Sequence, residues 1–310
     1  MSIEGLSALL AAGLAAGAPI ALAALGGLFT AAAGSLSVSL EGSMIVGAFF
    51  AAAASEAGGG VYVGFAAAAL AGLSLALLVG YVSTKLGADV FVAGLAANLL
   101  APGFVSILSA SIFGTKGVVS ATSLGLAELQ IPFFGELPFI GRALFGQDPA
   151  FYALVMASLI LSLVFLATPF GLRLRAAGDP GEAAAAAGID RGRARLAAHL
   201  VAGAAAGLAG AALSAKVAAF VPGMSSGRGW IALVALYLGG SRPLGAALAS
   251  LGFGLLIALS NAAQAIQGAP AELFLAAPYL ITALALVFGK ALGKSAVRKA
   301  SSVAHRGGGA

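Results

Sequence analysis

The sequence predicts an all-α polytopic membrane protein with about eight to ten transmembrane helices. Three observations lead to this fold class: 61% of the 310 residues are hydrophobic, only 9% are charged, and the mean hydropathy is +1.06. Soluble domains are close to half apolar and a quarter charged, so a chain of this composition is expected to bury its surface in lipid. The abundance of alanine and glycine is typical of helices that pack closely within a membrane.

Nine apolar segments approach the roughly 20 residues that a helix needs to cross the hydrocarbon core. In chain order they are 6–28, 35–54, 61–82, 90–112, 151–169, 196–219, 229–240, 243–265 and 273–292. The second and seventh are doubtful as full spans, and each contains or follows a turn rich in glycine and serine, GSLSVSLEG or PGMSSGRG. Interrupted segments that run in opposite directions in the two halves are typical of an inverted-repeat core with short or broken helices.

The basic residues predict the orientation, because cytoplasmic loops carry an excess of lysine and arginine. If residues 171–196 are cytoplasmic, most of the 16 basic residues fall inside. The inside set is Lys85, Arg173, Arg175, Arg191, Arg193, Arg195, Arg242, Lys290, Lys294, Arg298, Lys299 and Arg306. The outside set is Lys116, Arg142, Lys216 and Arg228. We therefore expect a multi-pass membrane protein with its N-terminus outside and its C-terminus in the cytoplasm.

The chain is expected to form one transmembrane domain over residues 1–294, followed by a basic and disordered cytoplasmic tail over 295–310. The long outer loop, 113–150, is apolar and contains prolines and aromatic residues, as in loops that pack on helix ends or meet a partner. With no cysteine and two histidines, neither catalytic residues nor a metal site are expected. His199, near the basic end of a span, is expected at the membrane surface.

Much of the charge lies in GLRLRAAGDPGEAAAAAGIDRGRARL, residues 171–196, around one short alanine-rich helix. Asp179 suits the N-cap, Pro180 the first helical position, and Glu182 follows the cap by three residues. Gly188 supplies a left-handed stop. Two helical turns are marginal alone in water, so we expect this helix to lean on a partner, with the flanking arginines available to carboxylates or lipid phosphates. An ordinary interfacial helix with a basic flank explains the pattern equally well.

Four polar residues within apolar segments are candidates to line a solute path: Glu41, Asn98, Asn261 and Gln264. Intramembrane acids are costly and face a cavity or a partner. For Glu41 we favour a structural role, with the carboxylate satisfied by the nearby serines at 37, 39 and 43. Hydrogen bonds between helices explain the three amides at least as well.

Glycines in one segment indicate a close contact between helices. Gly203 and Gly207 form a G-x-x-x-G pattern, and Gly210 follows one turn later. Small residues at this spacing let two helix backbones approach closely. The pattern is compatible with a contact within the chain or across a dimer.

Six stretches in chain order carry a family resemblance. They are LGGLFTAAAGSLSVSLEGSMIVGAF, VAGLAANLLAPG, IPFFGELPFIGRALFGQDPAFY, GLRLRAAGDPGEAAAAAGID, SSGRGWIALVALYLGGSRPLGA and APYLITALALVF. Together they resemble the inner-membrane permeases of ABC importers in the branched-chain amino acid, ribose and nucleoside family, most closely the nucleoside and simple-sugar branch. The resemblance covers roughly residues 18–288 and implies that the chain forms half of a translocation path for a nucleoside or simple sugar.

The resemblance also implies partners. A cytoplasmic ABC ATPase would dock on the coupling segment 171–195, a second related permease would complete a heterodimer, and an extracytoplasmic lipoprotein would deliver the solute. The resemblance also implies the bacterial inner membrane as the location, with lipid around the chain, and nucleic acid is not expected as a partner. This chain would hold no cofactor, because the ATPase binds ATP and magnesium. The implied ATPase-coupling residues are Arg173, Arg175, Asp179, Pro180, Glu182, Ala184, Ala185 and Gly188.

An ion-driven secondary transporter of a small polar solute is the alternative function. Such a transporter favours ionisable groups within the membrane, where Glu41 stands nearly alone. Gly293-Lys294-Ser295 resembles part of a phosphate loop, but the first glycine of that motif would fall at Phe288. Energy is therefore expected from a separate chain. The carried solute stays open among a nucleoside, a ribose-like sugar, an autoinducer sugar and riboflavin.

Overall fold

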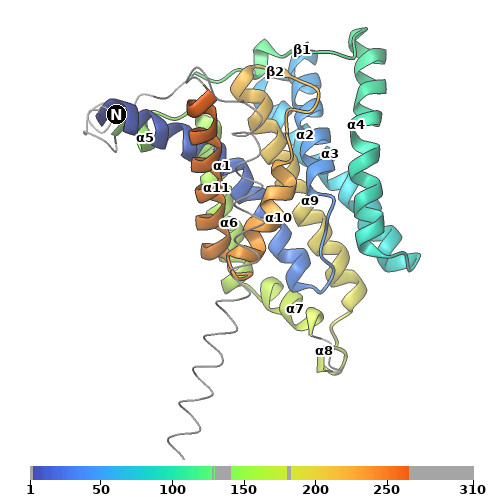
Figure 1. Ribbon diagram of the computed structural model, residues 1–310. Coiled ribbons are helices and arrows are strands. Elements are labelled where there is room, and N and C mark those ends of the chain that lie inside the picture. The colour runs from blue at the N-terminus through green and yellow to red at the C-terminus, as the bar shows by residue number, and fades with distance from the viewer. Residues whose placement is uncertain (1–2, 128, 130–140, 180–182, 265–310) are drawn as a thin grey trace, which may run out of the picture. The chain divides into compact units, whose positions relative to one another are not determined.

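The computed structural model describes residues 3–127, 129, 141–179 and 183–264, and helices dominate them (Figure 1). One compact unit ends at Ala258, and of a second unit that begins at Leu259 only residues 259–264 are described. In the described residues 6 helical stretches are long and apolar enough to cross a membrane: Glu4–Ala32, Leu40–Lys85, Val90–Phe113, Pro149–Ala167, Arg191–Val217 and Pro243–Gln264. The prediction of an all-α polytopic membrane protein is confirmed.

The long helices follow the predicted apolar segments. They are α1 (Ile3–Ala32), α3 (Gly60–Lys85), α4 (Val90–Phe113), α6 (Pro149–Ala167), α9 (Arg191–Val217) and α11 (Pro243–Gln264). Two predicted segments give shorter helices: α2 (Leu40–Ala54) has 15 residues and α10 (Arg228–Leu238) has 11. At 1.5 Å per residue these cover about 22 and 17 Å, less than the roughly 30 Å hydrocarbon core. The ninth predicted segment, 273–292, and the tail, 295–310, lie outside the described residues.

Helices α2 and α3 form a hairpin, which η1 (Ser55–Gly59) closes with one π-helical turn. Gly58 has φ +92° and Gly60 has φ +64°, backbone conformations that favour glycine and let the chain reverse. Beyond the turn, Gly64 faces the Ala51 carbonyl, where an added Cβ would lie only 2.8 Å from the oxygen. The hairpin therefore depends on glycine both for its turn and for its close packing.

Helix α9 packs against both arms of this hairpin through small residues. A Cβ added to Gly203 or Gly207 would collide with α3, at Gly72 and Ala68 respectively, and one added to Gly210 would collide with α2. The predicted glycine contact therefore lies within the chain. Because lipid offers no hydrophobic drive for helices to associate, this backbone-to-backbone packing stabilises the bundle.

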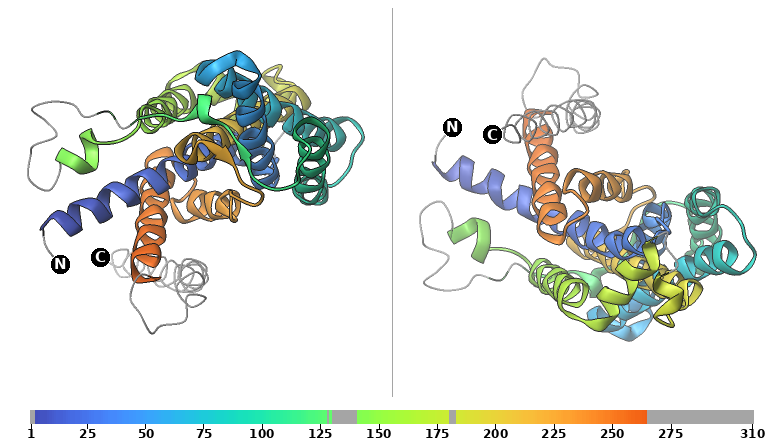
Figure 2. Two further views of the ribbon diagram at one scale, coloured as in Figure 1. Left: turned by 90° about the horizontal axis from the view of Figure 1, so that it is seen from above. Right: turned by 90° about the horizontal axis from the view of Figure 1, so that it is seen from below.

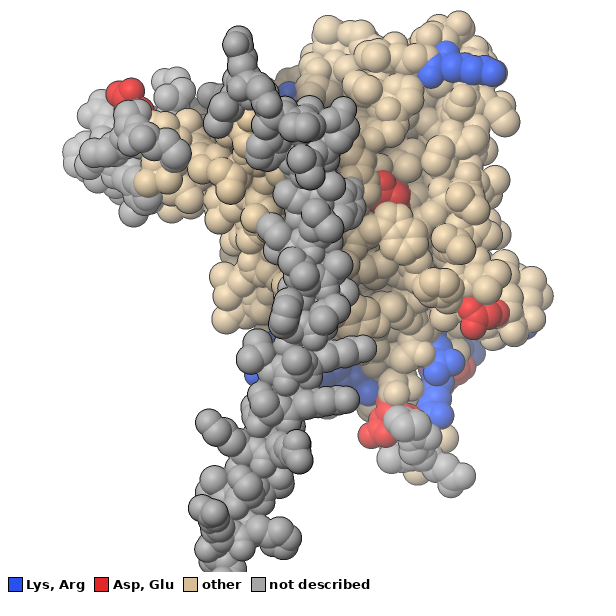
Figure 3. All heavy atoms as spheres, viewed as in Figure 1, with Lys and Arg blue, Asp and Glu red and all other residues tan. Residues whose placement is uncertain are grey.

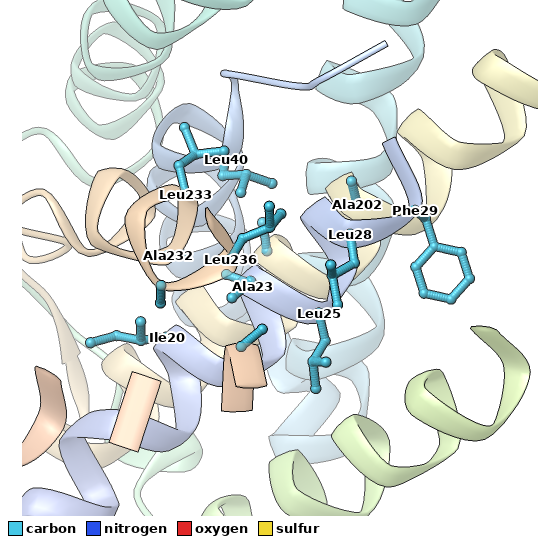
Figure 4. Packing of buried hydrophobic residues seen from close by; sticks show 14 of the residues in the cluster. Ile20, Ala23, Leu25, Leu28, Phe29, Leu40, Ala202, Ala232, Leu233 and Leu236 are labelled. Atoms are coloured by element: carbon cyan, nitrogen blue, oxygen red, sulfur yellow. The ribbon is translucent and has the colours of Figure 1, made fainter. Parts of the chain in front are cut away.

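Helix α1 crosses the middle of the first unit, with α6 on one side and α10 on the other (Figure 2). Its buried side chains include Ile20, Leu25 and Leu28, which pack with residues of α2, α9 and α10 (Figure 4). Leu40 begins α2 and Leu236 lies in α10, so this core joins the two short helices to α1. A second apolar cluster lies among α2, α3, α4, α9 and residues 119–124.

The described part of the predicted outer loop, 113–150, packs on helix ends. Strand β1 (Val119–Ser120) pairs antiparallel with β2 (Ala219–Phe220), which follows α9. In η2 (Thr122–Leu124), Ser123 donates to Glu56 of η1 from its backbone nitrogen at 3.1 Å and its hydroxyl at 2.9 Å. The loop then leads through α5 (Gly141–Phe145) to α6.

Candidate functional site

The predicted coupling segment begins with a helix that the sequence analysis did not predict, α7 (Pro169–Gly178). Thr168 donates its hydroxyl to the Val164 carbonyl at 2.6 Å and accepts from the Gly171 backbone nitrogen at 3.3 Å. It therefore closes α6 and caps α7, and proline at the first position favours the new helix. Thr-Pro between an apolar span and a mixed apolar and basic stretch was the available sequence signal.

The alanine-rich helix α8 (Ala183–Ala186) is a single turn. Gly188 has φ +71°, the left-handed conformation that the sequence predicts, and its nitrogen donates to the Ala185 carbonyl at 2.9 Å. Ala184 is buried within the chain, whereas Ala185 is exposed. Pro180 and Glu182 lie outside the described residues.

Three arginines of the segment donate to backbone carbonyls of this chain. Arg175 Nη1 donates to the Phe165 backbone carbonyl at 2.6 Å, and its guanidinium lies 5.2 Å from the centroid of the Phe165 ring. Arg191 Nη2 donates to the Asp179 oxygen at 2.6 Å, and Arg195 Nε donates to the Ala33 oxygen at 3.2 Å. Asp179, predicted as an N-cap, has extended backbone angles at the end of α7. These arginines join α6, α7, α9 and the end of α1.

Two other arginines stay at the surface. Arg173 is exposed on α7, and the Arg193 side chain is 88% exposed although its Nε lies 3.2 Å from an Asp190 oxygen. Asp190 caps α9, and the Arg193 backbone nitrogen, donating to this carboxylate, lowers the pKa of Asp190. So exposed an ion pair adds little stability. Figure 3 shows lysine and arginine gathered at the end of the molecule that carries α7 and α8.

A second site lies where the N-terminal ends of the short helices α2 and α10 meet, and we call it the half-helix junction. Glu41, in the first turn of α2, accepts from the Ser225 hydroxyl at 2.6 Å and the Gly227 nitrogen at 2.9 Å. Its other carboxylate oxygen accepts from the Gly229 nitrogen at 2.7 Å. The donors belong to the start of α10, so the expectation that nearby serines satisfy this carboxylate is wrong. A negative charge at a helix N-terminus is stabilised by the free amides there.

Asn98 of α4 serves the other half of the junction. Its Oδ1 accepts from the Gly42 nitrogen at 2.8 Å, and its Nδ2 donates to the Val38 carbonyl at 2.9 Å. Ser39, the N-cap residue of α2, makes no side-chain capping bond, so Asn98 supplies the acceptor that α2 needs. Both Glu41 and Asn98 are buried, at 9% and 8% exposed.

The other two polar candidates are separate. Asn261 and Gln264 lie in the last turns of α11, within the second unit, and both are exposed. Whether any of the four residues touches a solute stays a prediction. In the described residues no three side chains of His, Cys, Asp or Glu gather to hold a metal ion.

The expectation that the His199 side chain lies at the surface is wrong. It is fully buried in α9, with Nε2 3.0 Å from the Ser35 hydroxyl in the connection between α1 and α2. The small residues around it explain the difference, because Gly80 of α3 lets that helix approach His199 closely, with an added Cβ only 3.1 Å from the His199 Cβ. No local sequence signal marks this contact.

An apolar groove of about 570 Å³ lies among α2, α3 and α4. Phe50, Leu75 and Phe104 are among its lining residues, and the hydroxyl of its one lining serine, Ser74, donates to the Leu70 carbonyl. A polar solute needs hydrogen-bonding partners that this lining does not offer. The groove suits hydrocarbon instead.

Comparison with known proteins adds an independent finding. Residues 9–288 match the family described as "Branched-chain amino acid transport system / permease component". The chain is 31% identical to the guanosine ABC transporter permease protein NupQ of Bacillus subtilis, with 98% of each chain covered. It is 31% identical to the nucleoside ABC transporter permease protein NupC of Lactococcus lactis, with 90% of this chain and 91% of the relative covered.

A third relative is TsgC13 of Haloferax volcanii, provisionally named a glucose ABC transporter permease protein. It is 30% identical, with 79% of this chain and 74% of the relative covered. No solved structure matches the chain.

Proposed function

Because this chain belongs to the branched-chain amino acid transport system permease family, we propose that it is the membrane subunit of an ABC importer for a nucleoside or simple sugar. It forms half of the translocation path and is driven by a separate ATPase. The names of the three relatives support both the transporter class and the solute class. The observation that carries the proposal is a short, braced segment, α7–α8, between two apolar spans.

The ATPase is proposed to dock on the face of α7–α8 that points away from the membrane helices. Ala185 and Arg173 are exposed there, while Ala184 and Leu174 are buried against the chain. A surface of methyl groups lets a partner helix or groove approach closely, and the guanidinium of Arg173 can pair with a carboxylate. The three arginine-to-carbonyl bonds brace this surface against the membrane helices, so a push on it would reach them.

We further propose that α7–α8 lies in the cytoplasm, with the N-terminus of the chain outside and the C-terminus inside. Seven basic residues support this orientation, since they lie in or beside the helix ends that meet at α7–α8: Lys85, Arg173, Arg175, Arg191, Arg193, Arg195 and Arg242. Lys116 and Lys216 lie near the opposite ends of α4 and α9. This asymmetry follows the positive-inside rule.

The remaining partners follow from the importer class. A second, related permease would complete the path as a heterodimer, and an extracytoplasmic lipoprotein would present the solute. ATP and magnesium would bind to the ATPase. The solute itself can be identified by measuring which of guanosine, ribose and glucose the purified binding protein retains.

The test is uptake by the complete complex in liposomes. Mutation of the phosphate-binding lysine of the ATPase should abolish uptake, and collapse of the ion gradients by an uncoupler should not. Uptake that survives the lysine mutation but stops with the uncoupler would reject the ABC importer in favour of an ion-driven transporter.

The docking surface is tested by a matched pair of substitutions. Ala185→Glu should leave the chain folded and inserted but reduce the amount of ATPase that copurifies with it, because Ala185 is exposed. Ala184→Glu should instead lower the yield of folded chain, because Ala184 is only 2% exposed. Full ATPase binding and uptake with Ala185→Glu would count against docking at α8.

A further inference from the structure

We propose that the connection between α1 and α2, residues 33–39, transmits motion from α7–α8 to the half-helix junction, and that Ser35 and His199 are its positioning residues. This proposal rests on the proposed docking of an ATPase at α7–α8. Figure 1 shows the connection running beside α9, from the end of α1 to the start of α2.

The connection meets α7 at its cytoplasmic end. Gly178, the last residue of α7, packs directly on the Ala32 carbonyl and on Gly34. A Cβ at Gly178 would collide with that carbonyl oxygen and lie 3.1 Å from the Gly34 nitrogen. Gly34 has φ +67°, a conformation that favours glycine. No side chain cushions this backbone contact, so a displacement of α7 is passed directly to residues 32–34.

Helix α9 also binds this connection. Arg195 donates to the Ala33 carbonyl, and one turn further along α9 His199 bonds with the Ser35 hydroxyl. Arg191, at the start of this helix, also donates to the Asp179 carbonyl at the end of α7. Helix α9 is therefore bonded both to the connection and to α7. His199 is fully buried and Ser35 is 5% exposed, so water does not compete for their bond.

Inside the molecule, hydroxyl groups continue the chain of contacts. Thr30 of α1 accepts from the Ser37 nitrogen at 3.1 Å, and the Ser37 and Ser39 hydroxyls lie 2.9 Å apart. Both serines are 1% exposed. Residues 35, 37 and 39 are thus all fixed by buried hydrogen bonds, and a segment held at alternate residues moves with its neighbours rather than bending between them.

The connection ends at the half-helix junction. Asn98 donates to the Val38 carbonyl and accepts from the Gly42 nitrogen, which ties α4 to the start of α2. The carboxylate of Glu41, in the first turn of α2, accepts hydrogen bonds from backbone nitrogens at the start of α10. A shift of residues 33–39 therefore repositions both short helices together, which is what a switch between outward and inward access requires of a broken-helix core.

The connection and the residues bonded to it bury five polar side chains: Thr30, Ser35, Ser37, Ser39 and His199. A packed apolar connection would stabilise the fold without them, since hydrogen bonds between membrane helices contribute little net stability. Directional bonds instead fix one position of the connection relative to α7 and α9. This is the property that transmission needs.

The test uses a reporter at the junction that requires no knowledge of the solute. The chain has no cysteine, so Ser226→Cys gives a single exposed thiol in the turn before α10. In the complete complex, with partner chains free of reactive cysteine, the rate of maleimide labelling is measured without nucleotide and with ATP bound. We expect ATP to change this rate in the otherwise unaltered chain.

Ser35→Ala and His199→Leu should each reduce the ATP-dependent change in labelling about twofold to thirtyfold, the range of single substitutions along a coupling network. Because the two substitutions remove the same hydrogen bond, the double variant should lose no more of the ATP-dependent change than the more affected single variant. His199→Gln, which keeps a hydrogen-bonding group near the Nε2 position, should restore most of the change. Ser250→Ala is the matched control: this serine is also buried, but its hydroxyl bonds to Ala246 within α11.

The amount of copurified ATPase distinguishes a failure of the proposed transmission from a failure of the proposed importer function. Ser35→Ala should leave the copurified ATPase unchanged, whereas Ala185→Glu should reduce it. If the ATPase is bound and Ser35→Ala labels like Ser250→Ala, transmission through the connection is wrong and the importer function stands. Losses that simply add in the double variant would also overturn the transmission. If the unaltered chain retains no ATPase, both proposals fail.

Discussion

Replacing Glu41 by glutamine tests the half-helix junction most directly. Glutamine keeps one oxygen for the Ser225 hydroxyl and the Gly227 nitrogen, but its amide group then meets the Gly229 nitrogen, which is also a donor. One charge-assisted bond, worth about 1.5–3 kcal/mol, is lost. The loss of charge weakens the other two by about 1 kcal/mol together. The expected destabilisation is therefore about 2.5–4 kcal/mol.

The assay is thermal unfolding of the purified chain in detergent. An unfolding entropy of about 2.1 cal/mol/K per residue makes 1 kcal/mol worth about 1.5 °C of Tm in a chain of 310 residues, so Glu41→Gln should lower Tm by about 4–6 °C. Glu56→Gln is the matched control, because Glu56 also accepts from several donors but is exposed in the turn between α2 and α3, where water can replace them. A Tm equal to that of the unaltered chain, or an equal shift for the control, would refute the reasoning.

Three further comparisons, each between a substitution and its control, test the packing around the junction and within the bundle. Gly229→Ala should sharply lower the yield of folded chain, since its Cβ would lie 2.5 Å from backbone of α2, whereas Gly252→Ala meets nothing within 4 Å and should be neutral in the same expression assay. Asn98→Asp keeps an acceptor for the Gly42 backbone nitrogen of α2, whereas Asn98→Leu leaves that buried nitrogen unsatisfied at a cost of about 1–3 kcal/mol. Asn98→Asp should therefore lower Tm less than Asn98→Leu. Equal shifts would contradict the capping role. Gly207→Val should separate α9 from α3 and reduce the folded fraction on size exclusion, while Gly103→Ala, in open space, should not.

Local features of the sequence predicted the helices well. The predicted segment 90–112 corresponds to Val90–Phe113, and 61–82 to Gly60–Lys85, because apolar length is a property of the segment itself. The left-handed conformation of Gly188 was also predicted, because glycine after a short helix is a local stop signal. Helix α7 was missed because its mixed composition gives no long apolar run, although Thr168 and the proline after it marked its start.

The site residues were harder to predict. The sequence identified Glu41 and Asn98 as unusual, since polar groups in apolar segments stand out by composition alone. It assigned the wrong partners to Glu41 and the wrong environment to His199. In both cases the true partner lies far away in the chain: Ser225 is 184 residues from Glu41, and Ser35 is 164 residues from His199.

By itself, the sequence determined that this protein is a helical membrane protein, where its described apolar helices lie, and that α2 and α10 are doubtful as full spans. These properties follow from hydropathy and from turn-forming residues, which act over a few positions. Only the tertiary structure decided that the ends of the two short helices meet, and that residues 33–39 join them to α7. The reason is physical: a buried hydrogen bond is formed by whichever groups helix packing brings within 3 Å or so, and packing is set by the whole bundle.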